Sequence, residues 1–203
     1  MKSAPKPFSR ILLAYDGSAD ARRALYFAAA LARGSRLVEH IAVLRVIGGS
    51  YLARHVKNVD LRVTRLEEVR EWRRVRRRYL EQEIRPQLQE AGEYLARQGV
   101  AIPIDLRRAE GRVGEEILKL AEAEGFTTII LGRRGLSSLK ELLLGSVTRT
   151  VTHRARGLTV LVVGSKGEIN PDCPVTPLLV PVDGSDAGQA AVWQAAVLPF
   201  CMW

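Results

Sequence analysis

The residues TTIILGRRG (127–135) and, nine residues later, GSVT (145–148) decide the fold expected for this chain. The apolar run 127–131 has the length and composition of a buried strand, and the glycines that follow it indicate a turn. A helical pattern then begins at Val147. A helix that starts close to the carboxyl end of a parallel strand is a typical phosphate site. The stretch therefore predicts an α/β protein with an anion site at one end of its sheet.

Strand-length apolar runs alternate with helical patterns on either side of this stretch. We expect strands at 10–15, 35–47, 100–107, 127–131 and 158–163, and helices at 19–33, 63–97, 111–124 and 147–155. This alternation predicts a parallel sheet with helices on both faces. Pro103 and the mixed polarity of the third strand favour an edge position for it. Pro86 is expected to kink or split the long helix, because proline lacks the backbone donor.

Composition limits the class of protein. The 203 residues are 47% hydrophobic and 26% charged, as in a soluble globular protein with one good core and an additional piece. The apolar runs are too short for a signal sequence or a membrane span, so we expect a cytoplasmic protein. Cys173 and Cys201 lie in no metal-binding pattern, so neither a zinc site nor a disulfide framework is expected. The net charge of +9 by itself does not identify a partner.

The long helix carries a dense basic cluster, formed by Arg73, Arg74, Arg76, Arg77 and Arg78. One interpretation is a solvated helix face, partly balanced by the glutamates around it. The other is a surface that docks on an acidic partner or on nucleic acid. Nucleic acid is not the expected partner, since the chain shows no recognisable nucleic-acid-binding fold.

The end of the chain repeats its beginning. PLLVPVDGS (177–185) restates RILLAYDGS (10–18), and 187–198 restates the first alanine-rich helix. We therefore expect a lead-in at 1–9, a complete domain at 10–164, a linker at 165–176 and, at 177–203, a truncated second copy. This second copy holds one strand and one helix, too little to bury a core by itself.

The first and fourth strands are expected to form one crevice, because ligands bind where the strand order of an open sheet reverses. Asp16 and Gly132 then face each other, and Asp16 suits a ribose hydroxyl or a metal ion. Glycines let backbone amides approach phosphate oxygens, while the amides of Val147 and Thr148 open a helix whose positive end favours anions. A simpler interpretation stays open for each of these residues. The glycines can be plain turn residues, Asp16 can belong to a common turn, and Ser146 can serve only as a helix N-cap.

The spacing Gly-x2-Gly-x9-Gly-Ser (132, 135, 145, 146), with Asp16-Gly17-Ser18 and the strand 159–163, resembles the universal stress protein family in its nucleotide-binding branch. The resemblance implies a Rossmann-like (adenine nucleotide alpha hydrolase-like) open five-stranded parallel sheet of order 3-2-1-4-5. It also implies a homodimer through the fifth strand, and ATP, with or without Mg²⁺, bound across the sheet.

The resemblance further assigns roles to particular residues. Ala14, Tyr15 and Asp16 would line the adenosine, and the backbone of Val46 would meet adenine. The phosphates would be held by Gly132, Arg133, Gly135, Gly145, Ser146, Val147 and Thr148. Two features depart from the family: the helix after the second strand is unusually long, and Arg45 stands where many members carry histidine. The second copy has no phosphate loop, so we expect one site per chain.

The sequence leaves open whether the protein is an enzyme. It contains no P-loop of the GxxxxGK[ST] type, no GxSxG and no HExxH, and its three histidines are scattered. Without a positioned general base, ATP is expected to act as a signal that biases dimer or partner association. The alternatives are a slow ATPase or nucleotidyl-transfer enzyme of the related adenine nucleotide hydrolase group, and a structural module that binds partners through the arginine-rich helix.

Overall fold

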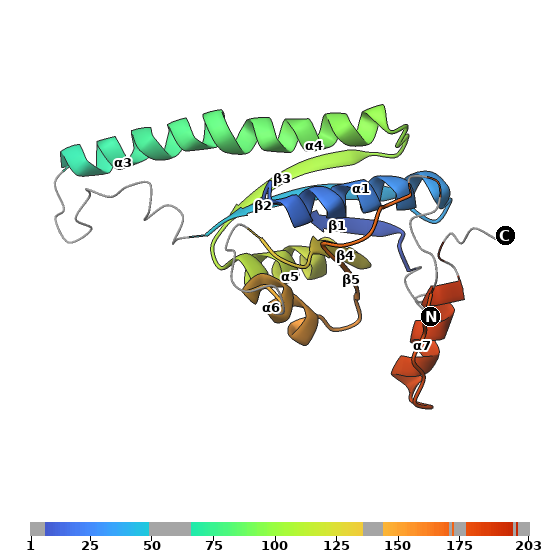
Figure 1. The fold of residues 1–203 in the computed structure, drawn as a ribbon. Helices are drawn as coiled ribbons and strands as arrows, with labels where there is room; N and C mark the ends of the chain where they lie inside the picture. Colours follow the sequence, from blue (N-terminus) through green and yellow to red (C-terminus); the bar gives the residue numbers. More distant parts are fainter. Residues whose placement is uncertain are drawn as a thin grey trace.

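The fold is an open five-stranded parallel sheet in the order β3-β2-β1-β4-β5 (Figure 1). It is seen in a computed structural model, which describes residues 7–48, 66–135, 144–170, 172, 178–196 and 198. The strands are β1 (Arg10–Ala14), β2 (His40–Ile47), β3 (Ile104–Glu110), β4 (Thr128–Gly132) and β5 (Thr159–Val163). The strand order and the parallel α/β architecture expected from the sequence are confirmed.

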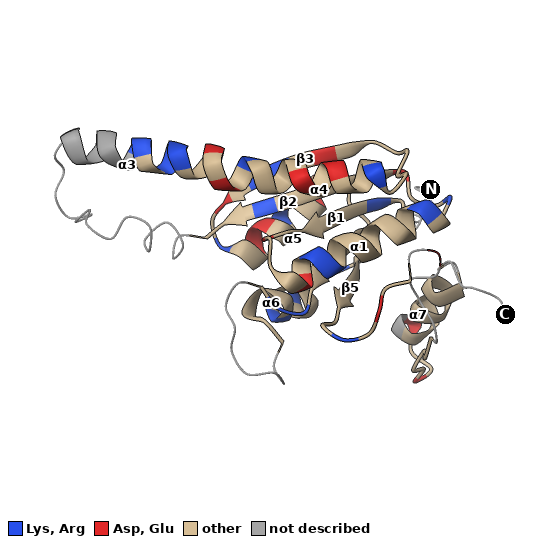
Figure 2. Cartoon of the chain, turned by 45° about the horizontal axis from the view of Figure 1, so that its top comes forward, with Lys and Arg blue, Asp and Glu red and all other residues tan. Residues whose placement is uncertain are grey.

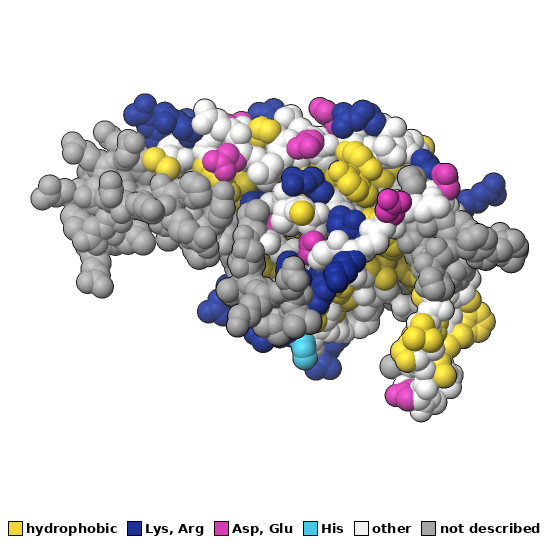
Figure 3. Space-filling model, viewed as in Figure 1, with side chains coloured by type: hydrophobic (Ala, Val, Ile, Leu, Met, Phe, Trp, Pro, Cys, Tyr) yellow, Lys and Arg dark blue, Asp and Glu magenta, His cyan; other side chains and the backbone are white. Residues whose placement is uncertain are grey.

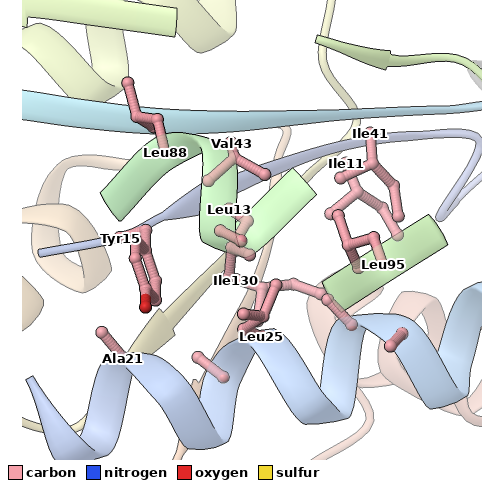
Figure 4. Close-up of a cluster of buried hydrophobic side chains, with 14 of the residues drawn as sticks. Ile11, Leu13, Tyr15, Ala21, Leu25, Ile41, Val43, Leu88, Leu95 and Ile130 are labelled. Atoms are coloured by element: carbon pink, nitrogen blue, oxygen red, sulfur yellow. The ribbon is translucent and has the colours of Figure 1, made fainter. Parts of the chain in front are cut away.

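Helices cover both faces of the sheet. The helices of the described chain are α1 (Ala19–Gly34), α3 (Leu66–Tyr79), α4 (Arg85–Arg97), α5 (Val113–Ala123), α6 (Ser146–Arg154) and α7 (Asp186–Ala196), with a π-helical segment η1 (Leu80–Ile84), and four of them cover the sheet. Helices α1 and α4 pack on one face, around Leu13, Val43 and Ile130 (Figure 4). Helices α5 and α6 pack on the other face, around Leu12 and Ile129.

Burial falls from the centre of the sheet to its edges. Every residue of β4 is buried, as are the three central residues of β1, whereas most residues of the edge strands β3 and β5 are half-buried or exposed. A central strand covered on both faces has to be apolar throughout, which explains the unbroken apolar runs in the sequence. The edge position expected for the third strand is confirmed.

Two strands begin later than their sequence pattern indicates. Strand β2 starts at His40, because Ser35 and the residues after it form a turn at the end of α1. Strand β3 runs over Ile104–Glu110 rather than 100–107, because its length is set by pairing with β2 from Ile41 to Ile47. Local sequence does not encode this register.

The long helix crosses Pro86 without a break in its path. Helices α3 and α4 continue through η1 as one rod along the top of Figure 1. At the end of η1 the amide of Arg85 donates to the carbonyl of Leu80, five residues back, and Pro86 then lies in the first turn of α4. Since the first amides of a helix need no helical acceptor, the missing donor costs little there. The expected interruption therefore takes the form of a π turn.

The arginine cluster projects beyond the sheet on α3, as the blue segments in Figure 2 show. Arg73, Arg77 and Arg78 are exposed, and Arg76 forms an ion pair with Glu110 at the end of β3. The structure is thus consistent with the solvated-face interpretation of this cluster.

The two ends of the described chain differ in how they pack on the sheet. Phe8 is 1% exposed in the core, and its amide donates to the Thr128 hydroxyl at 3.2 Å. Phe8, which the sequence places in the lead-in, thus packs in the core. In the second copy α7 forms, but residues 178–182 form no strand. No helix in the described ranges has both the length and the apolar character needed to cross a membrane.

We predict that Ile130→Ala lowers the free energy of unfolding by about 2–5 kcal/mol, because Ile130 is fully buried and the shortened side chain leaves a cavity. Leu106→Ala on β3 is the control and should cost about 1 kcal/mol, since this side chain is 42% exposed. Guanidinium denaturation followed by circular dichroism measures both. Equal losses in the two variants would contradict the assignment of β4 to the core.

Candidate functional site

A pocket opens at the carboxyl ends of β1 and β4, where the strand order reverses. Strand β1 pairs with β2 on one side and with β4 on the other, so the connections leave it in opposite directions. The pocket has an empty volume of about 450 Å³. Part of this volume is open to solvent. It is the kind of crevice that the sequence predicted between these two strands.

Most of the residues singled out in the sequence meet in this pocket. Its lining includes Ala14, Tyr15, Asp16, Val46, Gly132, Gly135, Val147 and Thr148. Arg133, Gly145 and Ser146 belong to the same loop and helix start but do not line the pocket itself. Ligand binding by these residues stays a prediction.

Backbone and hydroxyl bonds fix the start of α6 against the end of β4. The Gly145 amide donates to the Arg133 carbonyl at 3.0 Å. The Thr148 hydroxyl, which is buried, donates to the carbonyls of Gly132 at 3.0 Å and Arg133 at 3.2 Å. The residue at the N-cap is Gly145, and Ser146 is the first residue of α6, so the N-cap interpretation of Ser146 is wrong. The first amides of α6, which have no acceptor within the helix, thus lie beside the pocket.

At two glycines here other groups occupy the space of a side chain, and at Gly132 the obstacle is backbone, which cannot move aside as a side chain can. A Cβ on Gly132 would lie 2.6 Å from the carbonyl carbon of Asp20, and one on Gly135 would lie 2.5 Å from the Asp16 Oδ2 atom. Real Cβ atoms do not approach other atoms this closely. The glycine spacing therefore reflects the close approach of α1 and of the Asp16 carboxylate to the loop.

The turn after β1 orients Asp16. Its Oδ1 atom accepts the Ser18 amide at 3.0 Å, Gly17 adopts a φ of 76°, and the Ser18 hydroxyl caps α1 by accepting the Ala21 amide at 3.2 Å. One carboxylate oxygen is thereby engaged in the turn, and the other faces Gly135. Asp16 and the amide end of α6 thus belong to one pocket, as expected.

An apolar wall completes the other end of the pocket. It is formed by Ala14, Leu44, Val46, Val113, Ile117 and Leu131. These side chains come from β1, β2, α5 and β4, the face of the sheet that α5 and α6 cover. Such a wall suits a flat, weakly polar ring, while the opposite end suits an anion.

Tyr15 borders the pocket, but its ring packs in the core near Leu13 and Ala21 (Figure 4). Burial, followed by the charge of Glu90, raises the pKa of the Tyr15 hydroxyl above its ordinary value of 10.0. The hydroxyl therefore stays neutral at physiological pH, so the charge in the pocket comes from other residues.

Asp20 is a residue of the site that the sequence analysis missed. It is 8% exposed, and its Oδ2 atom accepts both the Arg134 amide at 3.1 Å and the Ser165 hydroxyl at 3.1 Å. Asp20 lies in the first turn of α1, where acidic residues are common because they stabilise the helix. Nothing in the local sequence therefore indicated its contacts with Arg134 and Ser165. Next to it, Arg23 donates to the carbonyls of Gly164, Lys166 and Gly167.

A model of the universal stress protein family matches residues 7–164. The chain belongs to the universal stress protein family. The match begins just before the buried Phe8 and ends just after β5, so it includes the sheet and the whole pocket.

Two curated universal stress proteins are similar to parts of the chain. Universal stress protein MJ0577 of Methanocaldococcus jannaschii is 52% identical over 52 residues, or 26% of this chain and 32% of that protein. Universal stress protein YxiE of Bacillus subtilis is 39% identical over 66 residues, or 32% of this chain and 43% of that protein. The matched segments thus span less than half of either relative.

Solved structures of the family share the fold over a longer range. The structure of MJ0577 has a TM-score of 0.62 and 28% identity, with 79% of this chain and 99% of that one covered. A universal stress protein in complex with cAMP has a TM-score of 0.54 and 19% identity, again with 79% and 99% covered. At the lower identity, the likeness concerns the fold.

We predict that Asp20→Ala speeds hydrogen exchange at the Arg134 amide at least about tenfold, because this half-buried amide loses its acceptor. Asp20→Asn keeps a side-chain oxygen and should stay close to the wild type. Exchange measured by NMR tests both variants, with Ser165→Ala as the control that removes the other partner alone. Wild-type exchange in Asp20→Ala would show that the carboxylate does not hold the loop.

Proposed function

We propose that this universal stress protein binds an adenine nucleotide, with ATP as the first candidate, and that nucleotide binding biases its association with a second copy or a regulatory partner. The observation that carries the proposal is the convergence of three different groups on one pocket. These are an apolar wall, the oriented carboxylate of Asp16 and the amide end of α6. A nucleotide has three parts that correspond to these groups.

The two ends of the pocket support a single orientation of the nucleotide. The base would lie at the wall formed by Val46, Val113 and its neighbours, with Ala14 and Tyr15 close to the adenosine. The phosphates would lie at Gly132, Arg133, Gly135 and the start of α6, where free amides and the helix dipole favour negative charge. The structure of a family member in complex with cAMP is in line with an adenine nucleotide as the class of ligand.

Magnesium, in this proposal, enters with the nucleotide. Within the described ranges, His, Cys, Asp and Glu side chains form no group of three or more that would hold a metal ion. Mg²⁺ is commonly held by one or two carboxylates together with substrate phosphates, and Asp16 supplies one carboxylate beside the pocket. The chemistry it would supply is neutralisation of phosphate charge.

A short path of bonds connects the phosphate loop with the edge of the sheet. The Arg133 amide donates to the Val163 carbonyl of β5 at 2.9 Å, and Asp20 bonds both to the loop and to Ser165, just beyond β5. Strand β5 is an edge strand in the described sheet. A ligand that favours one arrangement of the loop can therefore shift association through β5. We propose the cytoplasm as its location, where adenine nucleotides are available.

Gly145→Leu tests the site, because a bulky side chain at the N-cap of α6 would press on the backbone of Arg133 and Arg134 and displace the residues proposed to border the phosphates. We expect ATP binding in the micromolar range for the wild type and an affinity at least about tenfold lower for the variant. Isothermal titration calorimetry measures both.

Gly164→Leu is the matched control for this test. A Cβ at Gly164 meets nothing within 4 Å, so this variant should bind like the wild type. Unchanged affinity in Gly145→Leu, or no binding by the wild type, would refute the proposed site.

Slow nucleotide turnover is the second candidate function, and the carboxylate of Asp16 in the pocket is the observation that favours it. The leading proposal expects no sustained release of phosphate or pyrophosphate, because the described lining of the pocket includes no histidine and its one carboxylate, that of Asp16, is engaged in the turn after β1. A turnover assay separates the two functions. Sustained release that Asp16→Ala abolishes would favour the enzyme.

A further inference from the structure

A second groove lies between the long helix and the edge strand β3, which run alongside each other (Figure 2). It has an empty volume of about 660 Å³, part of which is open to solvent. Its apolar floor is formed by Leu80, Ile84 and Leu88 of the helix and by Leu106 of β3. Leu80 and Ile84 belong to the π-helical segment η1, and π turns within helices are frequent at functional sites.

The groove is separate from the pocket at β1 and β4. Its helical residues belong to the core on the face that α1 and α4 cover. The apolar wall of the other pocket lies on the face that α5 and α6 cover. A ligand in this groove would therefore be a second ligand, on the other side of the sheet.

Charged side chains stand at the rim of the groove. Glu81 and Arg85 form an ion pair with each other, with 3.1 Å between Oε2 and Nη1. Arg108 of β3 is exposed, and within the part of the chain that the structure describes no carboxylate forms an ion pair with it. The rim thus carries a positive charge that the described residues do not balance.

A second arginine lies next to Arg108 in the sheet. Arg45 of β2 is its partner in the register, about 4.8 Å away along the backbone, and faces the same side as Val43 of the α4-covered core. Arg45 is only 4% exposed, and its Nε atom is buried without a hydrogen-bond partner. Two residues further along β3, Glu110 pairs with Arg76 instead.

This pair of arginines favours an anion. A buried charge without a partner is costly, and two like charges on neighbouring strands repel each other. An anion at Arg108 lowers both costs, because it attracts the guanidinium that it contacts and the one beside it.

The surroundings of the groove are also positive. Figure 3 shows dark blue side chains over α3, the helix that leads directly into η1. Arg73, Arg77 and Arg78 of this helix are exposed. A positive field raises the local concentration of anions and speeds their association.

The floor and the rim suit two unlike parts of one ligand. A guanidinium binds a carboxylate through two parallel hydrogen bonds, which fits a carboxylate to Arg108. Leu106 is 42% exposed, so a hydrocarbon chain that covers the floor removes apolar surface from water.

We propose that the groove binds a small carboxylate with an apolar chain, of the kind found in a medium-chain fatty acid. The carboxylate lies at Arg108, where the charge of Arg45 adds to the attraction, and the chain lies on the floor formed by Leu80, Ile84, Leu88 and Leu106. This inference goes beyond the proposed function and does not depend on it.

Titration of the full, ¹⁵N-labelled chain with octanoate, followed by NMR, tests the site. Octanoate should shift amide signals of residues 80–89 and 104–110. Octanol keeps the chain without the charge, and acetate keeps the charge without the chain. Each should bind at least about tenfold more weakly than octanoate, because each loses one of the two contacts.

Arg108→Gln should weaken octanoate binding at least about tenfold, and it should fold like the wild type because Arg108 is exposed. Arg107→Gln is the matched control and should bind octanoate like the wild type. It removes the same charge from the same strand, but Arg107 pairs with Asp105 and Glu124 on the other face of the sheet.

Arg45→Met removes the buried charge and should lower the affinity about threefold. Octanol that binds as tightly as octanoate, or wild-type affinity in Arg108→Gln, would overturn the inference. Amide shifts confined to other parts of the chain, or no shifts at all, would also overturn it. Calorimetry of ATP binding reports on the other pocket alone, so the two sites succeed or fail independently.

Discussion

A close backbone contact joins the first turn of α1 to the end of β4. The backbone of Asp20 occupies the space where Gly132 would carry a side chain, so the helix and the strand approach as closely as two backbones allow. The pocket depends on this approach: it brings the Asp20 carboxylate within hydrogen-bond distance of the loop amide at Arg134, and it brings the turn at Asp16 to face Gly135. A larger residue at 132 would separate the two walls of the pocket.

In this part of the structure some polar groups bond to the protein, whereas others remain open to a ligand. The hydroxyl of Thr148 and the carboxylate of Asp20 are buried and bonded to protein partners, so they hold Arg133 and Arg134 in place. The first amides of α6 have no helical acceptor and belong to the part of the site that is open to a ligand. Preorganisation of this kind would lower the cost of ligand binding at Arg133, Arg134 and Gly145, because hydrogen bonds already hold these residues.

The sequence predicted most of the sheet, because a strand buried on both faces requires an unbroken apolar run such as Ile129 to Leu131. It also predicted the glycine loop and Asp16 as one site. It did not predict the ends of β2 and β3, which depend on pairing between strands, nor the burial of Phe8, which depends on a bond to distant Thr128. Asp20 escaped notice because its partner Arg134 lies 114 positions away. The apolar wall at Val113 and Ile117 needed the packing of α5 on the sheet.

The hydrogen bonds from Arg23 to the chain after β5 fix the path by which the polypeptide leaves the sheet. Three carbonyl groups, those of Gly164, Lys166 and Gly167, accept hydrogen bonds from one guanidinium on α1. The first residues after β5 therefore behave as a fixed exit rather than as a free tether. Because this path is fixed, the following segment can sample only part of the volume around the domain. Its effective concentration is therefore higher at surfaces within reach and lower at the others. The hydrogen bonds of Arg23 on α1 thus limit which surfaces can be reached by a segment more than a hundred and fifty residues further along the chain.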